Sequence, residues 1–237
     1  MTSPSDGLPE LAPVPPGALP AAAFPDGPAR TGGFRLAVLP TTAGQYWRYL
    51  LDRGLHEGPA PHLHGFPTGA GTGLRTTATG GVALDEPLAG LPATGVTWHG
   101  AVAYCAWLTG WAGARVRLPS AVEWQYAAGG PEGLRWSLGD AFDRAVYAPE
   151  ASGPRPVGCT PPNAFGLRDM TGNVFEWCAD SLQAPDGGAP VALGSRVLKG
   201  GAYTVRNPES FENATSFTAD EWSTVPYIGF RVLAEST

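Results

Sequence analysis

The sequence predicts one α+β domain with few regular elements, and three observations support this. The chain has 237 residues, of which 43% are hydrophobic, so it is long enough for one full-sized domain and short for two. Its 33 glycines and 25 prolines interrupt most stretches that could form long helices or strands. Eight Trp, nine Phe and seven Tyr are spread along the chain. We therefore expect a compact, loop-rich fold that depends on aromatic packing.

The N-terminal residues differ in composition from the rest of the chain. Residues 1–28 are rich in Pro, Ala and Gly and show little periodicity. Such a segment buries too little apolar surface to offset the entropy cost of ordering it. We expect a mobile or surface-draped arm over 1–28 and a single domain over 29–237. The domain should begin with a strand at Phe34, Leu36 and Val38, which alternate with polar or small residues.

Three helices are predicted from their boundary signals. The first begins after Thr42, a good N-cap residue, and ends at Gly54. The second begins in the stretch 97–108. The third begins after Ser120, which has the capping-box spacing with Glu123, and stops at a pair of glycines.

The remaining segments predict loops and short strands. Residues 56–81 contain too many glycines and prolines for a regular element, so we expect a long surface excursion there. After residue 130 the chain should consist mostly of turns and short strands. The final stretch 227–234, "YIGFRVLA", is typical of an edge or closing strand.

Charge and hydropathy exclude several classes of partner. The net charge is −6 and no basic run is present, which argues against binding to nucleic acid. No apolar stretch reaches the roughly 18 to 20 residues of a membrane span, and the N-terminus lacks the features of a signal peptide. We expect a cytoplasmic protein that contacts no membrane. The single lysine among 15 Lys and Arg residues indicates a bacterium with a GC-rich genome.

The three cysteines show no metal-binding spacing. Cys105, Cys159 and Cys178 are an odd number, so a disulfide framework is not expected in a reducing compartment. We interpret them as small buried residues.

The stretch 169–180, "DMTGNVFEWCAD", fits neither a helix nor a strand pattern. Two carboxylates, Asp169 and Glu176, flank an aromatic-rich turn that contains Gly172. The acids could hold a hard cation through oxygen ligands. Alternatively, both acids could accept backbone N–H groups in an ordinary dry turn.

Five segments in one order resemble a known family. They are "VTWHGAVAYCAWL", "RVRLPSAVEWQYAAGG", "PVGCTPPNAFGLRDMTGNVFEWCAD", "SRVLKGGAY" and "YIGFRVL". This pattern is similar to the formylglycine-generating enzyme, or sulfatase-modifying factor, family, which also includes the C-terminal domain of ergothioneine sulfoxide synthases and a pyoverdine-maturation protein. The resemblance spans about residues 34–233. It implies a compact C-type-lectin-like α+β fold with little regular secondary structure.

The resemblance also implies a calcium site at the turn described above. In the family, the matching segment binds calcium through the side chains at Asp169 and Glu176 and the backbone carbonyls at Gly172 and Val174. The resemblance thus favours the hard-cation alternative, and the dry turn stays open beside it. A second family calcium site needs an Asn where this chain has Val146, so that site is expected to be lost.

The activity for which the family is named needs two cysteines that this chain lacks. In the matching segment, the best ungapped placement puts Ser210 and Thr215 where those cysteines stand. The cysteines bind copper(I), a soft ion that selects thiolates, and hydroxyls do not replace them. We expect neither copper binding through paired cysteines nor sulfatase activation.

The segment after Tyr203 is rich in polar residues at the place where the family has its active groove. We consider a remodelled catalytic pocket there, in which Glu209 or Glu212 acts as general base and Arg206 holds an anionic group. Alternatively, the segment simply covers a solvated turn. The other candidate residues are Ser210 and Thr215 for catalysis, and Asn207, Asn213, Phe175 and Trp222 for substrate contacts and apolar walls.

Three histidines lie close together in the expected surface excursion. His56, His62 and His64 could form an open site for zinc or iron, because histidines two residues apart on an extended segment point to the same side. The alternative is a loop with surface imidazoles. No identity is predicted for a catalytic transition metal.

Two functions of different classes follow from these observations. The first is a small-molecule-tailoring enzyme, with oxidative or isomerising chemistry, that acts on a small-molecule or carrier-bound substrate in bacterial natural-product biosynthesis. The second is a non-catalytic binding module on a lectin-like scaffold. The residues do not specify the reaction or the oligomeric state.

Overall fold

Strands from both ends of the chain form the first of two four-stranded sheets. The computed structural model describes residues 8–19, 29–57, 72–181 and 194–236. The strand order in this sheet is β1-β4-β12-β7. These strands are β1 (Leu11–Val14), β4 (Phe34–Ala37), β12 (Leu233–Glu235) and β7 (Val116–Arg117). All three pairings are antiparallel.

The second sheet includes strands from the stretch 169–180 and from the segment "SRVLKGGAY". Its order is β10-β9-β8-β11, with one parallel pairing between β8 and β11. The strands are β8 (Phe175–Trp177), β9 (Ser195–Lys199), β10 (Phe217–Asp220) and β11 (Ile228–Gly229). Two short ribbons complete the strands: β2 (Gly17–Ala18) with β3 (Arg30–Thr31), and β5 (Leu74–Thr76) with β6 (Val82–Leu84).

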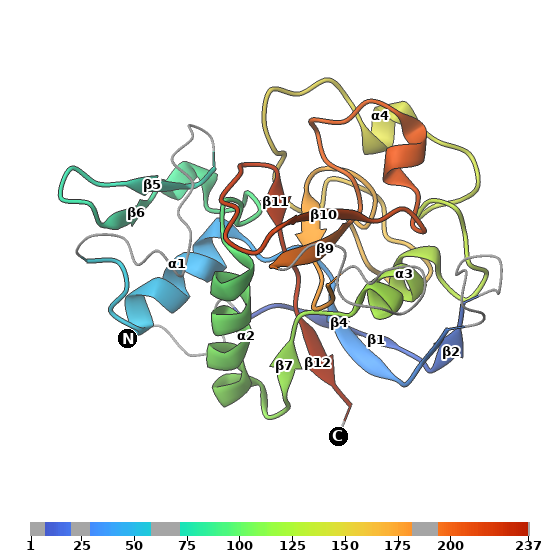
Figure 1. Ribbon diagram of the computed structural model, residues 1–237, viewed down its shortest axis with the longest axis horizontal. Helices are drawn as coiled ribbons and strands as arrows, with labels where there is room; N and C mark the ends of the chain where they lie inside the picture. Colours follow the sequence, from blue (N-terminus) through green and yellow to red (C-terminus); the bar gives the residue numbers. More distant parts are fainter. Residues whose placement is uncertain (1–7, 20–28, 58–71, 182–193, 237) are drawn as a thin grey trace.

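The described residues contain four α-helices, and the first three begin where the sequence predicted them. They are α1 (Ala43–Asp52), α2 (Trp98–Ala112), α3 (Ala121–Gly129) and α4 (Arg144–Tyr147), with 3-10 turns η2 (Glu86–Leu88) and η3 (Pro208–Phe211). The short α4 was not predicted, because mostly turns and short strands were expected after residue 130. Thr42 and Ser120 both form capping boxes, because each accepts from the third helical N–H while the residue there bonds back. Figure 1 shows α1 and α2 close together at one side of the sheets and α3 at another.

The expected arm over residues 1–28 is wrong for the part that the structure describes. Residues 11–14 form β1, and Val14 and Leu19 are buried. The segment also contacts α3, where a Cβ on Gly17 would collide with the Tyr126 ring. A proline in the strand concealed the pattern, although a strand at the edge of a sheet tolerates it. Residues 1–7 and 20–28 lie outside the described residues.

Two other expectations need refinement. The C-terminal stretch forms two strands instead of one: β11 lies at the edge of the second sheet, and β12 lies between β4 and β7 in the first. The expected excursion over 56–81 contains β5 and continues into the β5–β6 ribbon. Residues 58–71 within it are not described.

Aromatic side chains fill the interior between these elements. Trp124, Trp177, Tyr46, Tyr104 and Phe230 are among the largest fully buried side chains. Cys105 and Cys178 are buried and Cys159 is partly buried, and all three are free thiols, as expected. No helix among the described residues has the length and apolar composition needed to cross a membrane.

Candidate functional site

A groove opens beside Phe175 on the second sheet. Its volume is about 390 Å³, and residues from β8 to β11 line it. The lining side chains are Phe175, Leu198, Thr204, Val205, Phe217, Thr218, Ala219, Ser223, Val225, Tyr227 and Ile228. The described residues that line the groove include no carboxylate, imidazole, amine, guanidinium or thiol. Its polar groups are therefore hydroxyls and backbone.

Aromatic rings build the apolar wall of this groove. The centroid of the Phe175 ring lies 5.0 Å from that of Phe217 and 6.5 Å from that of Tyr227. Burial, and then the neighbouring Tyr227, raises the pKa of Tyr203 above its ordinary value.

The polar segment after Tyr203 does not point into the groove. Arg206 folds back on its own backbone, where Nη1 donates to the carbonyls of Tyr203 at 2.7 Å and Val205 at 3.3 Å. Glu212 accepts from the guanidinium of Arg135 through Oε1. Glu209 is exposed. The expected catalytic pocket of these acids with Arg206 is not assembled.

The other candidates of the segment have structural contacts. The Thr215 hydroxyl donates to the Glu209 carbonyl at 2.8 Å. Asn213 is buried, and its Nδ2 donates to the Leu134 carbonyl at 2.8 Å. Asn207 is exposed at the start of η3, and Ser210 lies within η3. Neither Ser210 nor Thr215 lines the groove, whereas Thr204 and Val205 do.

A buried lysine explains why the segment takes this shape. Lys199 Nζ donates to the carbonyls of Ala214 and Thr215 and to the Ser216 hydroxyl, each at 3.2 Å. It also donates to Gln125 Oε1 at 3.1 Å. Burial lowers the pKa of this amine to about 8. Lys199 thereby ties the end of the segment to β9 and α3, a role that the sequence reasoning missed.

Trp222 is not a wall of the groove, contrary to our expectation. The centroid of its ring lies 4.3 Å from that of His99, at the start of α2, with the two rings tilted by 38°, and 46% of the residue is exposed. The walls that the sequence reasoning missed are Phe217 and Tyr227. The sequence did carry a signal for Phe217, because apolar and polar residues alternate over 217–220 as in a strand. In the structure Phe217 and Ala219 are partly buried and their neighbours are exposed.

At the turn of residues 169–180, the first acid accepts hydrogen bonds from the neighbouring loop. Asp169 Oδ1 accepts from the backbone N–H of Thr160 at 2.9 Å and from the Cys159 thiol at 3.3 Å. Its Oδ2 accepts from the backbone N–H of Gly158. Asp169 has a positive φ of 57°, which places its carboxylate against this loop.

The second acid forms a buried ion pair. Glu176 Oε1 and Oε2 accept from Nη2 and Nε of Arg231, both at 2.7 Å, and both side chains are fully buried. Oε2 also accepts from the Trp124 indole N–H at 2.7 Å. The Arg231 guanidinium therefore neutralises the Glu176 carboxylate and contacts both of its oxygens.

These contacts do not fit a calcium ion held by Asp169, Gly172, Val174 and Glu176. Both carboxylates are already used by N–H and S–H donors, and calcium would have to compete with the Arg231 guanidinium for Glu176. Gly172, with φ 91°, is explained by close packing, because a Cβ there would collide with the Tyr147 carbonyl. Asp169 accepts backbone N–H groups as the dry-turn alternative expects, whereas Glu176 accepts only from the side chains of Arg231 and Trp124 among the described residues.

The histidine cluster is described only in part. His56 lies with its ring against Trp47, and its Nε2 is 3.5 Å from Glu57 Oε1. His62 and His64 lie outside the described residues. Among the residues that the structure covers, no group of three or more His, Cys, Asp or Glu could hold a metal ion.

The comparisons with known proteins agree with this architecture. The family described as sulfatase-modifying factor enzyme 1-like domain matches residues 4–236. The solved structure of PvdO from Pseudomonas aeruginosa superposes with a TM-score of 0.70 at 25% identity, and covers 98% of this chain and 96% of that chain. The expected fold, α+β with little regular secondary structure, is therefore confirmed.

The chain also matches parts of two longer curated proteins. The formylglycine-generating enzyme of Mycobacterium tuberculosis is 31% identical over 190 residues, which are 62% of this chain and 58% of that enzyme. The serine/threonine-protein kinase Pkn1 of Chlamydia trachomatis is 33% identical over 183 residues, which are 72% of this chain and 28% of that kinase. The chain thus spans little more than a quarter of the kinase it matches. From the match over residues 4–236, the chain belongs to the formylglycine-generating enzyme, or sulfatase-modifying factor, family.

Proposed function

We propose that this chain is a non-catalytic binding domain, and that its ligand lies in the groove beside Phe175. The observation that carries this proposal is the chemistry of the groove. Aromatic and aliphatic side chains with a few hydroxyls line it, while Glu209, Glu212 and Arg206 make contacts elsewhere. A general base needs to reach the proton that it removes, and neither acid lines the groove.

The same lining defines the ligand class. Binding in such a groove is driven by apolar burial, at roughly 25 cal/mol per Å² of apolar surface, and hydroxyls fix the orientation. No charged side chain among the described lining residues could neutralise a ligand charge. The ligand is therefore a small, uncharged and mainly apolar molecule, or an apolar group of a larger partner.

Blocking the groove from the strand β10 tests this proposal. Nile red, an uncharged apolar dye, serves as the probe, and its fluorescence increase reports binding. Ala219→Trp adds bulk inside the groove, and we expect it to weaken dye binding at least about tenfold, or about 1.4 kcal/mol. The matched control is Ala78→Trp, which adds the same side chain at an exposed turn and should bind as the parent does. Equal dye binding by Ala219→Trp and the parent would contradict the proposal.

A small-molecule-tailoring enzyme is the second candidate, because relatives at 31% identity are named as enzymes. In this alternative the chain acts in the bacterial cytoplasm, in natural-product biosynthesis, on a small-molecule or carrier-bound substrate. The proton donor would be a phenol at the groove, where Tyr227 lies next to Tyr203. Sulfatase activation is not part of it, since both expected cysteine positions are hydroxyls.

Two measurements separate the candidates. Mass spectrometry of a sulfatase-type cysteine peptide, incubated with the protein and copper, should show no formylglycine. In a bacterium that carries the gene, the Tyr227→Phe variant keeps the aromatic ring and removes the hydroxyl. Deletion of the gene should first be shown to remove a metabolite. If the Tyr227→Phe variant binds Nile red normally but does not restore that metabolite, the result would favour the enzyme. Full restoration would favour the binding domain.

A further inference from the structure

Helix α2 presents an apolar face to the outside of the molecule. Its 15 residues include no Asp, Glu, Lys or Arg. Val102, Ala106, Gly110 and Trp111 are nevertheless exposed, Trp111 to 48%. A helix at a solvent surface normally carries charged residues on its outer side. An uncharged outer face with an exposed Trp indicates a surface that another molecule covers.

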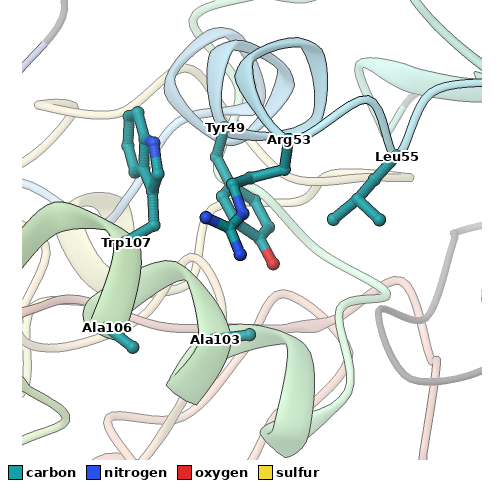
Figure 2. A pocket seen from close by; sticks show the side chains of 6 residues that line it. All are labelled: Tyr49, Arg53, Leu55, Ala103, Ala106 and Trp107. Atoms are coloured by element: carbon teal, nitrogen blue, oxygen red, sulfur yellow. The ribbon is translucent and has the colours of Figure 1, made fainter.

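A hollow of about 410 Å³ adjoins this face, between α1 and α2. It is lined by Tyr49, Arg53, Leu55, Ala103, Ala106 and Trp107. Figure 2 shows the side chains of Tyr49 and Arg53 extending from α1 into the space above Ala103 and Ala106, with Trp107 at one end. The backbone N–H of Arg53 donates to the Tyr49 carbonyl at 3.1 Å, but its guanidinium forms no hydrogen bond or ion pair with any residue that the structure describes. The hollow thus offers an apolar floor and the guanidinium of Arg53, while the Trp107 indole N–H at its wall donates to the Asp52 carboxylate at 2.7 Å.

The spacing along α2 makes this face complementary to itself. Ala103 and Trp111 each lie four residues from Trp107, on the same side of the helix. The Trp107 and Trp111 ring centroids are 6.3 Å apart, so Trp111 lies beside the wall of the hollow. In an antiparallel pair of α2 helices centred on Trp107, each Trp111 comes opposite Ala103 of the other copy, at the mouth of its hollow.

We propose that a second copy of this chain covers the α2 face, and that Trp111 of each copy enters the Tyr49–Trp107 hollow of the other. The indole then lies under the Arg53 guanidinium, which supplies a cation–π contact. Trp and Arg are enriched in the cores of such interfaces, and other charged residues are depleted. The second copy thereby uses both the exposed ring and the unpaired cation.

The face is small, so we expect a weak and reversible contact. A helix of 15 residues is about 22 Å long. With one neighbouring helix, such a face lies at the lower end of the roughly 800 Å² per partner that specific interfaces bury. We therefore expect a reversible dimer with a dissociation constant of about 1 to 100 μM.

Sedimentation velocity over about 1 to 500 μM protein tests the proposal. The parent should shift from monomer to dimer, and Trp111→Ser should stay monomeric throughout. Trp222→Ser is the matched control, because Trp222 is exposed to 46% on a different element, and it should dimerise as the parent does. A parent that is monomeric at every concentration would overturn the proposal, as would a Trp111→Ser variant that still dimerises.

A second variant tests the hollow itself. Ala106→Phe keeps Trp111 and fills the hollow of its own chain, so it should also abolish the dimer. Both Trp111 and Ala106 are exposed, so each variant should melt within a few degrees of the parent. If Ala106→Phe dimerises normally while Trp111→Ser does not, the placement of Trp111 in the hollow is wrong.

Discussion

Arg231 is fully buried, and the protein itself provides partners for its whole guanidinium group. Nε and Nη2 donate to Glu176, Nη1 donates to the carbonyls of Ala37 and Val38, and Nη2 also donates to the carbonyl of Arg168. One side chain therefore ties β8 to β4 and to the loop before residue 169. A buried charge is tolerated only when its hydrogen bonds are satisfied in this way.

Arg231→Lys should lower the free energy of unfolding by about 2 kcal/mol or more, because buried acceptors lose their donors. A lysine is a point charge with three donors and cannot reproduce the planar, five-donor arrangement around Glu176. Urea unfolding at neutral pH measures the loss. Arg115→Lys is the control, since Arg115 is largely exposed and its pair with Glu235 should contribute at most about 1 kcal/mol. Similar losses in both variants would contradict this account of Arg231.

The same contacts predict how the protein responds to calcium. Anything that binds only the folded state raises the melting temperature by mass action. Because Arg231 already neutralises Glu176, we expect the same melting temperature with about 1 mM calcium chloride and with excess EDTA. A calcium-dependent rise that Glu176→Gln removes would restore the calcium site and refute the dry turn.

At the residue scale, sequence reasoning found important positions more readily than their roles. Asp169 and Glu176 stood out as acids in an apolar turn, and both are buried in the structure. Their partners could not be read from the local pattern. Arg231 is 55 residues from Glu176, and Lys199 holds carbonyls 15 and 16 residues away. Only the folded chain brings these groups together.

At the scale of elements, predictability depended on whether the signal was local. The start of α1 was predicted from its N-cap residue Thr42 and that of α3 from its capping box, and both signals lie within four consecutive residues. Strand β1 was missed because its four residues become a strand only by pairing with β4, with Pro13 opposite Arg35. The groove was misassigned for the same reason, since its walls come from four strands and the loops between them.

The α3 capping box predicts a measurable contribution to stability. The Ser120 hydroxyl accepts the Glu123 N–H at 3.2 Å, and the Glu123 carboxylate accepts the Ser120 N–H at 2.8 Å. Ser120→Ala should lower the free energy of unfolding by about 1 kcal/mol, because the Glu123 N–H loses the hydroxyl that accepts it. Thermal and urea unfolding measure it. The matched control is Ser210→Ala, which should change stability by less than about 0.5 kcal/mol; a larger loss there than at Ser120 would refute the assignment.

At the scale of the whole molecule, the groove and the α2 face are separate surfaces. No lining residue of the groove belongs to α2 or to the hollow beside it. A ligand in the groove and a second copy on α2 can therefore be present together. This separation lets the two proposals fail independently: Ala219→Trp should leave the dimer intact, and Trp111→Ser should leave Nile red binding intact.

The ionisable groups of the interior act together on stability at alkaline pH. Burial raises the pKa of Cys159 and of Tyr49 to about 12, each from an ordinary value of 9.0 or 10.0. Burial also raises the pKa values of Cys105, Cys178, Tyr46 and Tyr104. These groups keep their protons in the folded state at pH values where the unfolded chain has released them. Their stabilising contribution is present below pH 9 and is lost as the pH rises.

The lowered pKa of Lys199 makes stability rise with pH, whereas the thiols and phenols make it fall. Together they predict maximum stability at about pH 9. The pKa of Lys199 is lowered from 10.5 to about 8, so between these values the unfolded chain holds the extra proton and rising pH adds stability. Above pH 9 several thiols and phenols outweigh this one amine. The free energy of unfolding, measured with urea at pH 7.5, 8.5, 9.5 and 10.5, should therefore show a small rise followed by a steep fall.

Cys105→Ala removes one of the thiols and should reduce the steepness of the fall above pH 9.5 by about 1 kcal/mol per pH unit. The cavity that the variant leaves lowers stability equally at every pH, so it does not affect this slope. An unchanged slope in that variant would mean that the Cys105 thiol ionises as easily in the folded protein as in the unfolded chain.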